Sequence, residues 1–342
     1  MSELPVIDIA PLVRGAHADA AARQQVAAQL GQACRDSGFF YVVGHGVSPG
    51  LQQELEALSR QFFALPLQQK LAIHMSRGGR AWRGYFPVGE ELTSGRPDQK
   101  EGIYFGAELG GDHPLVQSGT PLHGANLFPR ELPAFRSTVL TYLEAMTRLG
   151  QQLMQGLALS LELPESYFYD RYTRDPLILF RIFNYPPPAP AQDGGQDWGV
   201  GEHTDYGVLT ILRQDSAGGL EVRSGSRWLD APPIPDSFVC NIGDMLDRMT
   251  GGLYRSTAHR VRNRSGRLRL SFPFFFDPSW SALVQRIPLP RALSGALSVP
   301  GESDAARQRW DGVDVHAFQG TYGDYILSKV AKVFPGLRRS VL

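Results

Sequence analysis

Three residues of the chain have the types and the spacing of a metal site. His203 and Asp205 stand one residue apart in "GEHTDYGVLT" (201–210), at the start of an apolar run. If this stretch is a strand, both side chains project from one face, because side chains alternate along a strand. His259, in the strand-like "AHRVRN", supplies a third ligand. Two imidazoles and one carboxylate on one side of a metal leave the opposite positions open, as in the facial triad of non-haem iron(II) sites.

A second cluster, later in the chain, has the chemistry of a carboxylate anchor. In "RLRLSFPFFF" (267–276) the polar residues Arg267, Arg269 and Ser271 alternate with apolar ones, which predicts a strand with a polar inner face and an apolar face packed under helices. The planar guanidinium of Arg269 pairs two-pronged with a carboxylate, and Ser271 adds a hydroxyl to the same group. The sequence therefore predicts a carboxylate site beside the open face of the metal.

Each motif also has an ordinary structural interpretation. A histidine and an aspartate one residue apart usually form a polar turn before a strand, and an arginine in a strand is usually a solvated edge charge. A lone histidine such as His45 in "GHGV" is predicted to be structural rather than a ligand. The order of the motifs favours a site, because the pair, the third histidine and the anchor follow one another on successive predicted strands.

The elements that must position these residues change character along the chain. Residues 1–163 are predicted to be mostly helical, whereas 164–342 contain short segments rich in valine, isoleucine, phenylalanine and threonine, cut by glycine and proline. Such a series of short strands is typical of a sandwich or barrel. The predicted fold class is α+β, an all-β core with flanking helices. The predicted helices cover 18–38, 51–65, 132–161 and 321–334, and two short strands are predicted at 5–9 and 39–44.

The last predicted helix, "TYGDYILSKVAKVF" (321–334), is amphipathic. Tyr325, Ile326, Val330 and Val333 recur in it at helical spacing. We expect these four side chains to pack against the core.

The charge balance and the cysteines limit the partners and the compartment. Thirty-four basic residues balance 34 acidic ones, and no run of lysine or arginine is longer than two. Binding to nucleic acid or to an anionic membrane is therefore not expected, and the predicted partner is a small molecule. Cys34 and Cys240 show neither zinc spacing nor a disulfide framework. With no signal peptide and no membrane span predicted, the protein is expected in the cytoplasm.

At these motifs the sequence resembles a known family, the isopenicillin N synthase-like branch of the iron(II)- and 2-oxoglutarate-dependent oxygenases. The resemblance spans nearly the whole chain. "LPVIDIAPL" and "ACRDSGFFYVVGHGV" are similar to the N-terminal region of the family, and "HTDYGVLTIL", "NIGDML", "YRSTAHRV" and "RLSFPFFFDP" are similar to its catalytic half. The resemblance implies an N-terminal region at 1–163 and, at 164–342, a double-stranded β-helix, or jelly roll, with a C-terminal helix. It also implies that His203, Asp205 and His259 hold iron(II).

The resemblance further implies which residues bind a carboxylate. Arg269 and Ser271 would hold a carboxylate of the substrate or the cosubstrate, and the hydroxyl of Tyr185, in "FNYPP", would join them. Phe183 stands where many plant members of the family have asparagine. The additional contact made by that asparagine is therefore not expected here.

Branches of the family use this anchor differently. In the majority it binds 2-oxoglutarate, and the enzyme couples O2 and decarboxylation of this cosubstrate to hydroxylation, desaturation or ring closure of a small molecule. In isopenicillin N synthase it binds the carboxylate of the substrate, and 2-oxoglutarate is not used. The synthase also has an arginine two residues before the glycine of its Gly-Tyr motif, where this chain has Trp82, with Arg83 displaced by one. We therefore predict an oxygenase that uses iron(II), 2-oxoglutarate and O2.

Two alternatives stay open at this point. One is an oxidase of the synthase type, and the other is a non-catalytic binding protein on the same scaffold. The complete triad and anchor disfavour the second, because loss of turnover would be expected to erode at least one of them. In every case residues 82–105 and 186–200 are predicted to line the substrate entrance.

Overall fold

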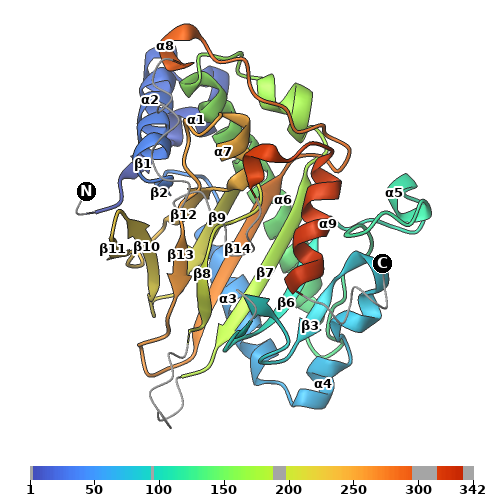
Figure 1. The fold of residues 1–342 in the computed structure, drawn as a ribbon. Coiled ribbons are helices and arrows are strands. Elements are labelled where there is room, and N and C mark those ends of the chain that lie inside the picture. The colour runs from blue at the N-terminus through green and yellow to red at the C-terminus, as the bar shows by residue number, and fades with distance from the viewer. Residues whose placement is uncertain (1–2, 94–95, 188–197, 295–313, 334–342) are drawn as a thin grey trace.

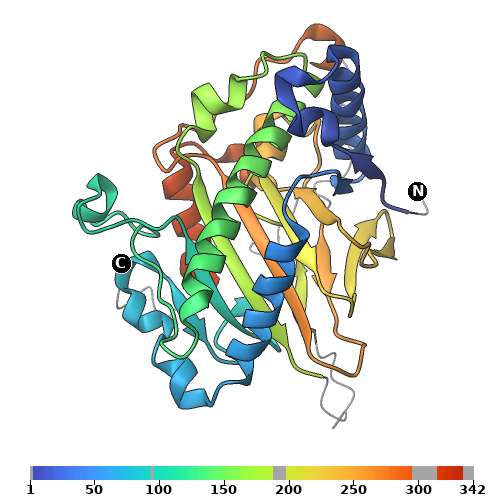
Figure 2. The same ribbon diagram turned by 180° about the vertical axis from the view of Figure 1, so that it is seen from behind.

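The structure of the chain is a computed structural model that describes residues 3–93, 96–187, 198–294 and 314–333. Two β-sheets lie face to face, and long helices cover the back of the larger sheet (Figure 1 and Figure 2). Among the helices of the described residues, none combines the length and the apolar character that a membrane crossing requires.

The large sheet mixes strands from both ends of the chain. Its order is β1 (Val6–Asp8), β2 (Phe39–Val43), β12 (Phe238–Ile242), β9 (Leu209–Gln214), β14 (Arg269–Asp277), β7 (Leu177–Tyr185), β6 (Glu101–Gly106) and β3 (Gly84–Phe86). The small sheet runs β11 (Arg227–Asp230), β10 (Leu220–Ser224), β13 (His259–Val261) and β8 (Val200–His203). A two-stranded ribbon joins β4 (Leu92–Thr93) to β5 (Arg96–Pro97). Only the pairing of β1 with β2 is parallel among the pairings of the described strands.

Three long helices lie behind the large sheet (Figure 2). They are α2 (Ala20–Asp36), α3 (Pro49–Ala64) and α6 (Pro133–Ser160), and α6 contacts the other two. The start of α3 shows why the chain turns helical there: the Ser48 hydroxyl accepts a hydrogen bond from the Leu51 amide, and Pro49 occupies the first helical position. The shorter helices are α1 (Ala10–Val13), α4 (Leu67–Leu71), α5 (Pro114–Gln117), α7 (Asp244–Met249), α8 (Arg291–Ser294) and α9 (Tyr322–Val333). Single turns of 3-10 helix cover Gly15–His17 and Val315–Ala317, a longer 3-10 segment covers Met75–Ala81, and a π-helical turn covers Tyr169–Thr173.

The predicted helices and the two early strands are confirmed, as is the packing of the C-terminal helix. In α9 the side chains of Tyr325, Ile326, Val330 and Val333 are all buried. The division between 1–163 and 164–342 stays a prediction, and strands from both sides of it share the large sheet.

The inner face of β14 differs from the prediction at its start. The strand begins at Arg269, and the side chain of Arg267 is exposed and donates a hydrogen bond to the Ser216 hydroxyl at 2.8 Å. Gly266, with a positive φ of 69°, still belongs to the preceding turn, so the alternation of faces begins two residues later than expected. Arg269 and Ser271 face inward as predicted, whereas Arg267 does not line the cavity.

Helix α6 is pressed closely against the outer face of β14. The phenylalanine rings of that face are fully buried, and a Cβ atom added at Gly150 of α6 would overlap the ring of Phe276. Only glycine allows the helix to approach this ring so closely. The position of α6 therefore fixes the outer face of β14 and, with it, the side chains that point inward.

Gly150→Ala should destabilise the protein by about 1–3 kcal/mol, because the added methyl group forces the helix or the Phe276 ring to move. The measurement is urea denaturation followed by circular dichroism. Gly50→Ala is the matched control, since the nearest heavy atom to a Cβ there is the Ser48 hydroxyl oxygen at 3.7 Å. It should be neutral or stabilise by about 0.4–1 kcal/mol. A Gly150→Ala protein as stable as the wild type would contradict the close packing.

Candidate functional site

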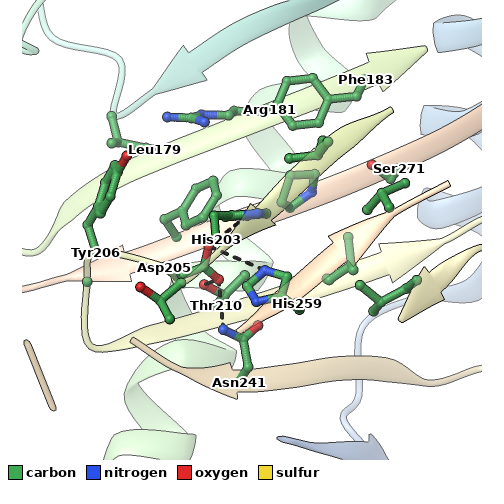
Figure 3. A pocket seen from close by; sticks show the side chains of 18 of the residues that line it. Leu179, Arg181, Phe183, His203, Asp205, Tyr206, Thr210, Asn241, His259 and Ser271 are labelled. Carbon is green, nitrogen blue, oxygen red and sulfur yellow. Dashed lines mark hydrogen bonds and ion pairs between the residues drawn. The ribbon is translucent and has the colours of Figure 1, made fainter. Parts of the chain in front are cut away.

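A cavity of about 110 Å3 lies between the two sheets, and both sheets contribute to its wall (Figure 3). His203 is the last residue of β8 and His259 is the first residue of β13, and the two are direct cross-strand partners. Their ring centroids are 4.2 Å apart. Pairing of the two strands therefore brings together two histidines that are 56 positions apart in the sequence (259 minus 203).

Asp205 reaches the same point by a different route from the one predicted. Strand β8 ends at His203, so Asp205 lies in the turn before β9 rather than on the same strand face. The turn is held because the Asp205 carbonyl accepts a hydrogen bond from the Asp244 amide at 2.8 Å, at the start of α7. The alternation of side chains along a strand therefore does not explain why His203 and Asp205 point to the same place. The turn after β8 brings the Asp205 side chain there.

The three side chains form a compact donor set. The Asp205 Oδ1 atom is 3.8 Å from His203 Nε2 and 3.7 Å from His259 Nε2. One donor atom from each residue lies within 4.8 Å of the others, and this is the group of the described residues that could hold a metal ion. The prediction that His203, Asp205 and His259 converge is therefore correct.

Hydrogen bonds orient both imidazoles toward the common centre. His203 Nδ1 is 2.8 Å from the Gly201 carbonyl, and His259 Nδ1 is 3.2 Å from the Thr257 carbonyl. A carbonyl only accepts, so each Nδ1 carries a proton, and in the neutral imidazole the lone pair is then on Nε2. This is the tautomer that a metal ligand needs.

The Asp205 carboxylate is held by residues of the large sheet. Its Oδ2 atom accepts hydrogen bonds from the Thr210 hydroxyl at 2.6 Å and from the Asn241 amide at 2.7 Å (Figure 3). Both bonds go to Oδ2, which leaves Oδ1 turned toward the histidines. Asp205 is thereby fixed in the orientation that a metal ligand requires.

The protonation states suit a divalent ion. Burial, together with the facing His259, lowers the pKa of His203 to about 4, so this imidazole is neutral at pH 7. Burial by itself would raise the pKa of Asp205, but the two histidines and the hydrogen bonds from Thr210 and Asn241 outweigh it and hold the pKa below its ordinary value. Uncharged imidazole nitrogens and an ionised carboxylate are ligands of iron(II).

The predicted carboxylate anchor also assembles at the cavity. Arg269 and Tyr185 are cross-strand partners on β14 and β7, and the guanidinium carbon lies 4.7 Å from the centre of the tyrosine ring. The Ser271 hydroxyl is 3.5 Å from the Tyr185 hydroxyl. All three side chains line the cavity. The structure therefore brings the predicted anchor residues together beside the triad.

Arg269 needs an anionic partner. Its side chain is 1% exposed, and its Nε atom donates to the Gly218 carbonyl at 2.5 Å. The Nη1 and Nη2 atoms are buried and have no hydrogen-bond partner among the described residues. Buried donors left unpaired cost free energy, and a charged one costs more. A ligand carboxylate is the group that would satisfy both nitrogens at once.

Several residues of the cavity were not predicted from the sequence. Thr210 and Asn241 lie at no spacing that marks a ligand support, because sheet pairing alone places them beside Asp205. The sequence does carry a signal for Arg181, since it is the one charged residue of "LILFRIFNY" (177–185) and shares a strand face with Tyr185. The predicted entrance segment 82–105 contributes Glu91 and Lys100 to the cavity wall.

Other predictions concern residues away from the centre. His45 is a structural residue: its Nδ1 atom accepts a hydrogen bond from the Val47 amide, and its ring packs edge-on against Phe238. Arg83 is fully buried, donates to the Leu122 carbonyl and is not among the described residues that line the cavity. Of the segment 186–200, Val200 lines the cavity, and 188–197 lie outside the described residues.

Two family models match the chain on either side of its middle. Residues 4–131 match the N-terminal region of a non-haem dioxygenase in morphine synthesis, and residues 177–278 match the 2OG-Fe(II) oxygenase superfamily. The second match contains the triad and the anchor.

Curated relatives cover almost the whole chain. A probable iron/ascorbate oxidoreductase of Dictyostelium discoideum is 48% identical, over 100% of this chain and 98% of its own length. A 1-aminocyclopropane-1-carboxylate oxidase of Dictyostelium mucoroides is 39% identical, over 98% of this chain and 96% of its own. A homoarginine-6-hydroxylase of Arabidopsis thaliana is 36% identical, over 97% of both chains.

Solved structures share the fold. A full-length protein of Neurospora crassa, solved in complex with alpha-KG, superimposes with a TM-score of 0.76 at 26% identity, covering 96% of each chain. The rice dioxygenase for auxin oxidation superimposes with a TM-score of 0.67 at 27% identity, covering 99% of this chain and 100% of its own. The predicted jelly-roll core with flanking helices is confirmed by this likeness.

Thr210→Val should weaken iron(II) binding about 10- to 100-fold, because loss of the hydroxyl frees one side of the Asp205 carboxylate to rotate. Anaerobic iron(II) titration of the purified protein measures the affinity. Thr210→Ser keeps the hydroxyl and should bind iron(II) nearly as the wild type does. Equal affinities of the valine variant and the wild type would show that Thr210 does not support the ligand.

Proposed function

Because the chain belongs to the 2-oxoglutarate- and Fe(II)-dependent oxygenase superfamily, we propose that the cavity between the two sheets is its active site. His203, Asp205 and His259 hold the iron(II) ion in this proposal. The observation that carries it is the convergence of two Nε2 lone pairs and one carboxylate oxygen on a single point. The protein itself is a non-haem iron(II)- and 2-oxoglutarate-dependent dioxygenase that uses O2 to oxidise a small organic molecule.

We further propose that Arg269, Ser271 and Tyr185 bind the cosubstrate. The two unpartnered guanidinium nitrogens of Arg269 are buried at the cavity wall, and a carboxylate of 2-oxoglutarate satisfies them two-pronged. The Ser271 and Tyr185 hydroxyls are close enough to donate to the same carboxylate. The anchor thus orients the cosubstrate with its keto acid end toward the triad.

The residues of the chain have a positioning and shielding role in the reaction. When bound, iron(II) would activate O2, and oxidative decarboxylation of 2-oxoglutarate to succinate and CO2 would supply two of the four electrons that reduce O2, with the substrate supplying the other two. Thr210 and Asn241 keep the Asp205 oxygen aimed at the metal. The apolar side chains of Phe39, Leu179 and Phe275 line the cavity and exclude water from the reacting groups.

The compounds named for the relatives support the proposal that the substrate of this protein is small and polar. They include an oxidase of 1-aminocyclopropane-1-carboxylate and hydroxylases of homoarginine, and two solved complexes of the Neurospora crassa protein contain thymine or 5-formyluracil. In this proposal the substrate has a similar size, and the oxidation is a hydroxylation, a desaturation or a ring closure.

Two assignments from the sequence also stand as proposals. The chain is divided into an N-terminal region, 1–163, and a catalytic jelly roll, 164–342. The protein works in the cytoplasm, a reducing compartment that suits its two free, buried cysteines, Cys34 and Cys240.

Arg269→Ala should lower the affinity for 2-oxoglutarate by tens-fold or more, because loss of a charged hydrogen-bonded pair in a sheltered site costs about 2–5 kcal/mol. Arg269→Lys should recover part of the affinity, since an ammonium restores the charge without the planar fork. Ser271→Ala and Tyr185→Phe should each cost about 1 kcal/mol. The measurement is anaerobic titration of 2-oxoglutarate into the iron(II) protein, followed by the visible charge-transfer band of the chelate.

Arg267→Ala is the control for this series, because its side chain is exposed and lies outside the cavity. Its titration should coincide with that of the wild type. If the iron-loaded wild type gave no band and no heat of binding with 2-oxoglutarate, the cosubstrate assignment would fall and an oxidase of the synthase type would take its place.

A further inference from the structure

A second arginine lines the cavity on the side away from the anchor. Arg181 lies on β7, on the same strand face as Phe183 and Tyr185. In Figure 3 Arg181 lies above His203, and Ser271 of the anchor lies farther to the right. At about 3.3 Å per residue, four positions separate the Cα atoms of Arg181 and Tyr185 by about 13 Å. The two arginines therefore serve opposite ends of the cavity.

The guanidinium of Arg181 is only weakly paired. Its Nη1 atom is 3.4 Å from Glu91 Oε1, longer than the 2.7–2.9 Å or so that is typical of a charged hydrogen bond. The Nε atom is buried without a hydrogen-bond partner among the described residues. Glu91 has closer partners, because Lys100 lies 2.8 Å from its Oε2 atom and the Tyr104 hydroxyl donates to its Oε1 atom. Arg181 thus keeps the capacity to bind another anion.

The surroundings keep Arg181 charged and hold it in place. Burial alone would lower the pKa of Arg181, but the facing tyrosines and acids, Asp205 among them, outweigh it and raise the pKa above its ordinary value. The guanidinium carbon lies 4.3 Å from the ring centre of Tyr104 and 4.9 Å from that of Phe275. Stacking on two rings restrains a long side chain that would otherwise lose rotamer freedom on binding.

The cosubstrate does not account for this cation. A 2-oxoglutarate anchored at Arg269 has its other end at the triad, so no carboxylate of the cosubstrate is left for Arg181. Leu179, Phe183 and Phe275 give the wall around Arg181 an apolar surface. The vicinity of Arg181 therefore combines this apolar lining with a cation that is less tightly paired than the neighbouring Lys100, which both Glu91 and Asp98 hold.

We propose that Arg181 binds a carboxylate of the primary substrate, which is accordingly a small organic acid with a short apolar body. The inference rests on the proposed function, since it takes the triad as the reacting centre and Arg269 as the cosubstrate anchor. Arg181 is in this view a substrate-binding residue that sets specificity and takes no part in holding the metal.

The test uses matched pairs of probes in the full chain loaded with iron(II) and saturating 2-oxoglutarate, without O2. The probes are 1-aminocyclopropane-1-carboxylate, cyclohexanecarboxylate and benzoate, each compared with its own primary amide, which has nearly the same shape and lacks the negative charge of the carboxylate. Calorimetry measures binding. The wild type should bind at least one acid more tightly than its amide. In Arg181→Gln the dissociation constant of that acid should rise about 30-fold or more, and the preference over the amide should disappear.

Arg181→Lys should keep part of the preference for the acid, and the exposed-residue variant Arg267→Gln should keep all of it. A purely structural role for Arg181 would weaken the acid and the amide together, and that result would overturn the proposal. So would equal affinities of acid and amide in the wild type, or failure of every acid to bind at millimolar concentration.

The charge-transfer band of 2-oxoglutarate, recorded before any probe is added, separates this inference from the proposed function. A missing band in the wild type contradicts the cosubstrate assignment. A normal band without a preference for acids contradicts only the role of Arg181. The band of Arg181→Gln verifies that the variant is folded and loaded, and Arg181→Lys gives the comparison if it is not.

Discussion

The cross-strand pair of His203 and His259 is the contact on which the rest of the site depends. Both imidazoles come from the small sheet, and each Nδ1 atom faces the carbonyl two residues earlier in the chain, that of Gly201 or Thr257. The carboxylate between them is fixed from the opposite side, by Thr210 and Asn241 of the large sheet. The donor set therefore spans the gap between the sheets. A change in the distance between the sheets would therefore move the Asp205 oxygen relative to both imidazoles.

The same constraint explains why the back of the large sheet is so tightly packed. Asp277, at the end of β14, accepts a hydrogen bond from the Val208 amide at 3.2 Å, and a Cβ atom at Gly207 would collide with its carboxylate. The turn that carries Asp205 is thus tied to β14. Helix α6 in turn fixes β14 through the contact of Gly150 with Phe276. A chain of contacts connects the outer helix layer to the position of one ligand oxygen.

Residues whose placement follows a local rule could be predicted from the sequence, whereas residues whose placement depends on strand pairing could not. Alternation along a strand places Arg269 and Ser271 inward, and this prediction is correct. It fails at Arg267, where a turn continues for two further residues. It also gives the wrong reason for His203 and Asp205, because the strand ends between them. Thr210 becomes a partner of Asp205 only through the course of the chain in three dimensions, so no spacing in the sequence reveals it.

The side chains of α9 close one wall of the cavity, with Ile326 and Val333 facing into it. All proposed metal and cosubstrate ligands precede residue 278, whereas this wall comes from the last helix described. During translation the ligands therefore leave the ribosome before the side chains that shield them. Until α9 is in place, this side of the cavity has no wall, so docking of the last helix would be what closes the site to solvent.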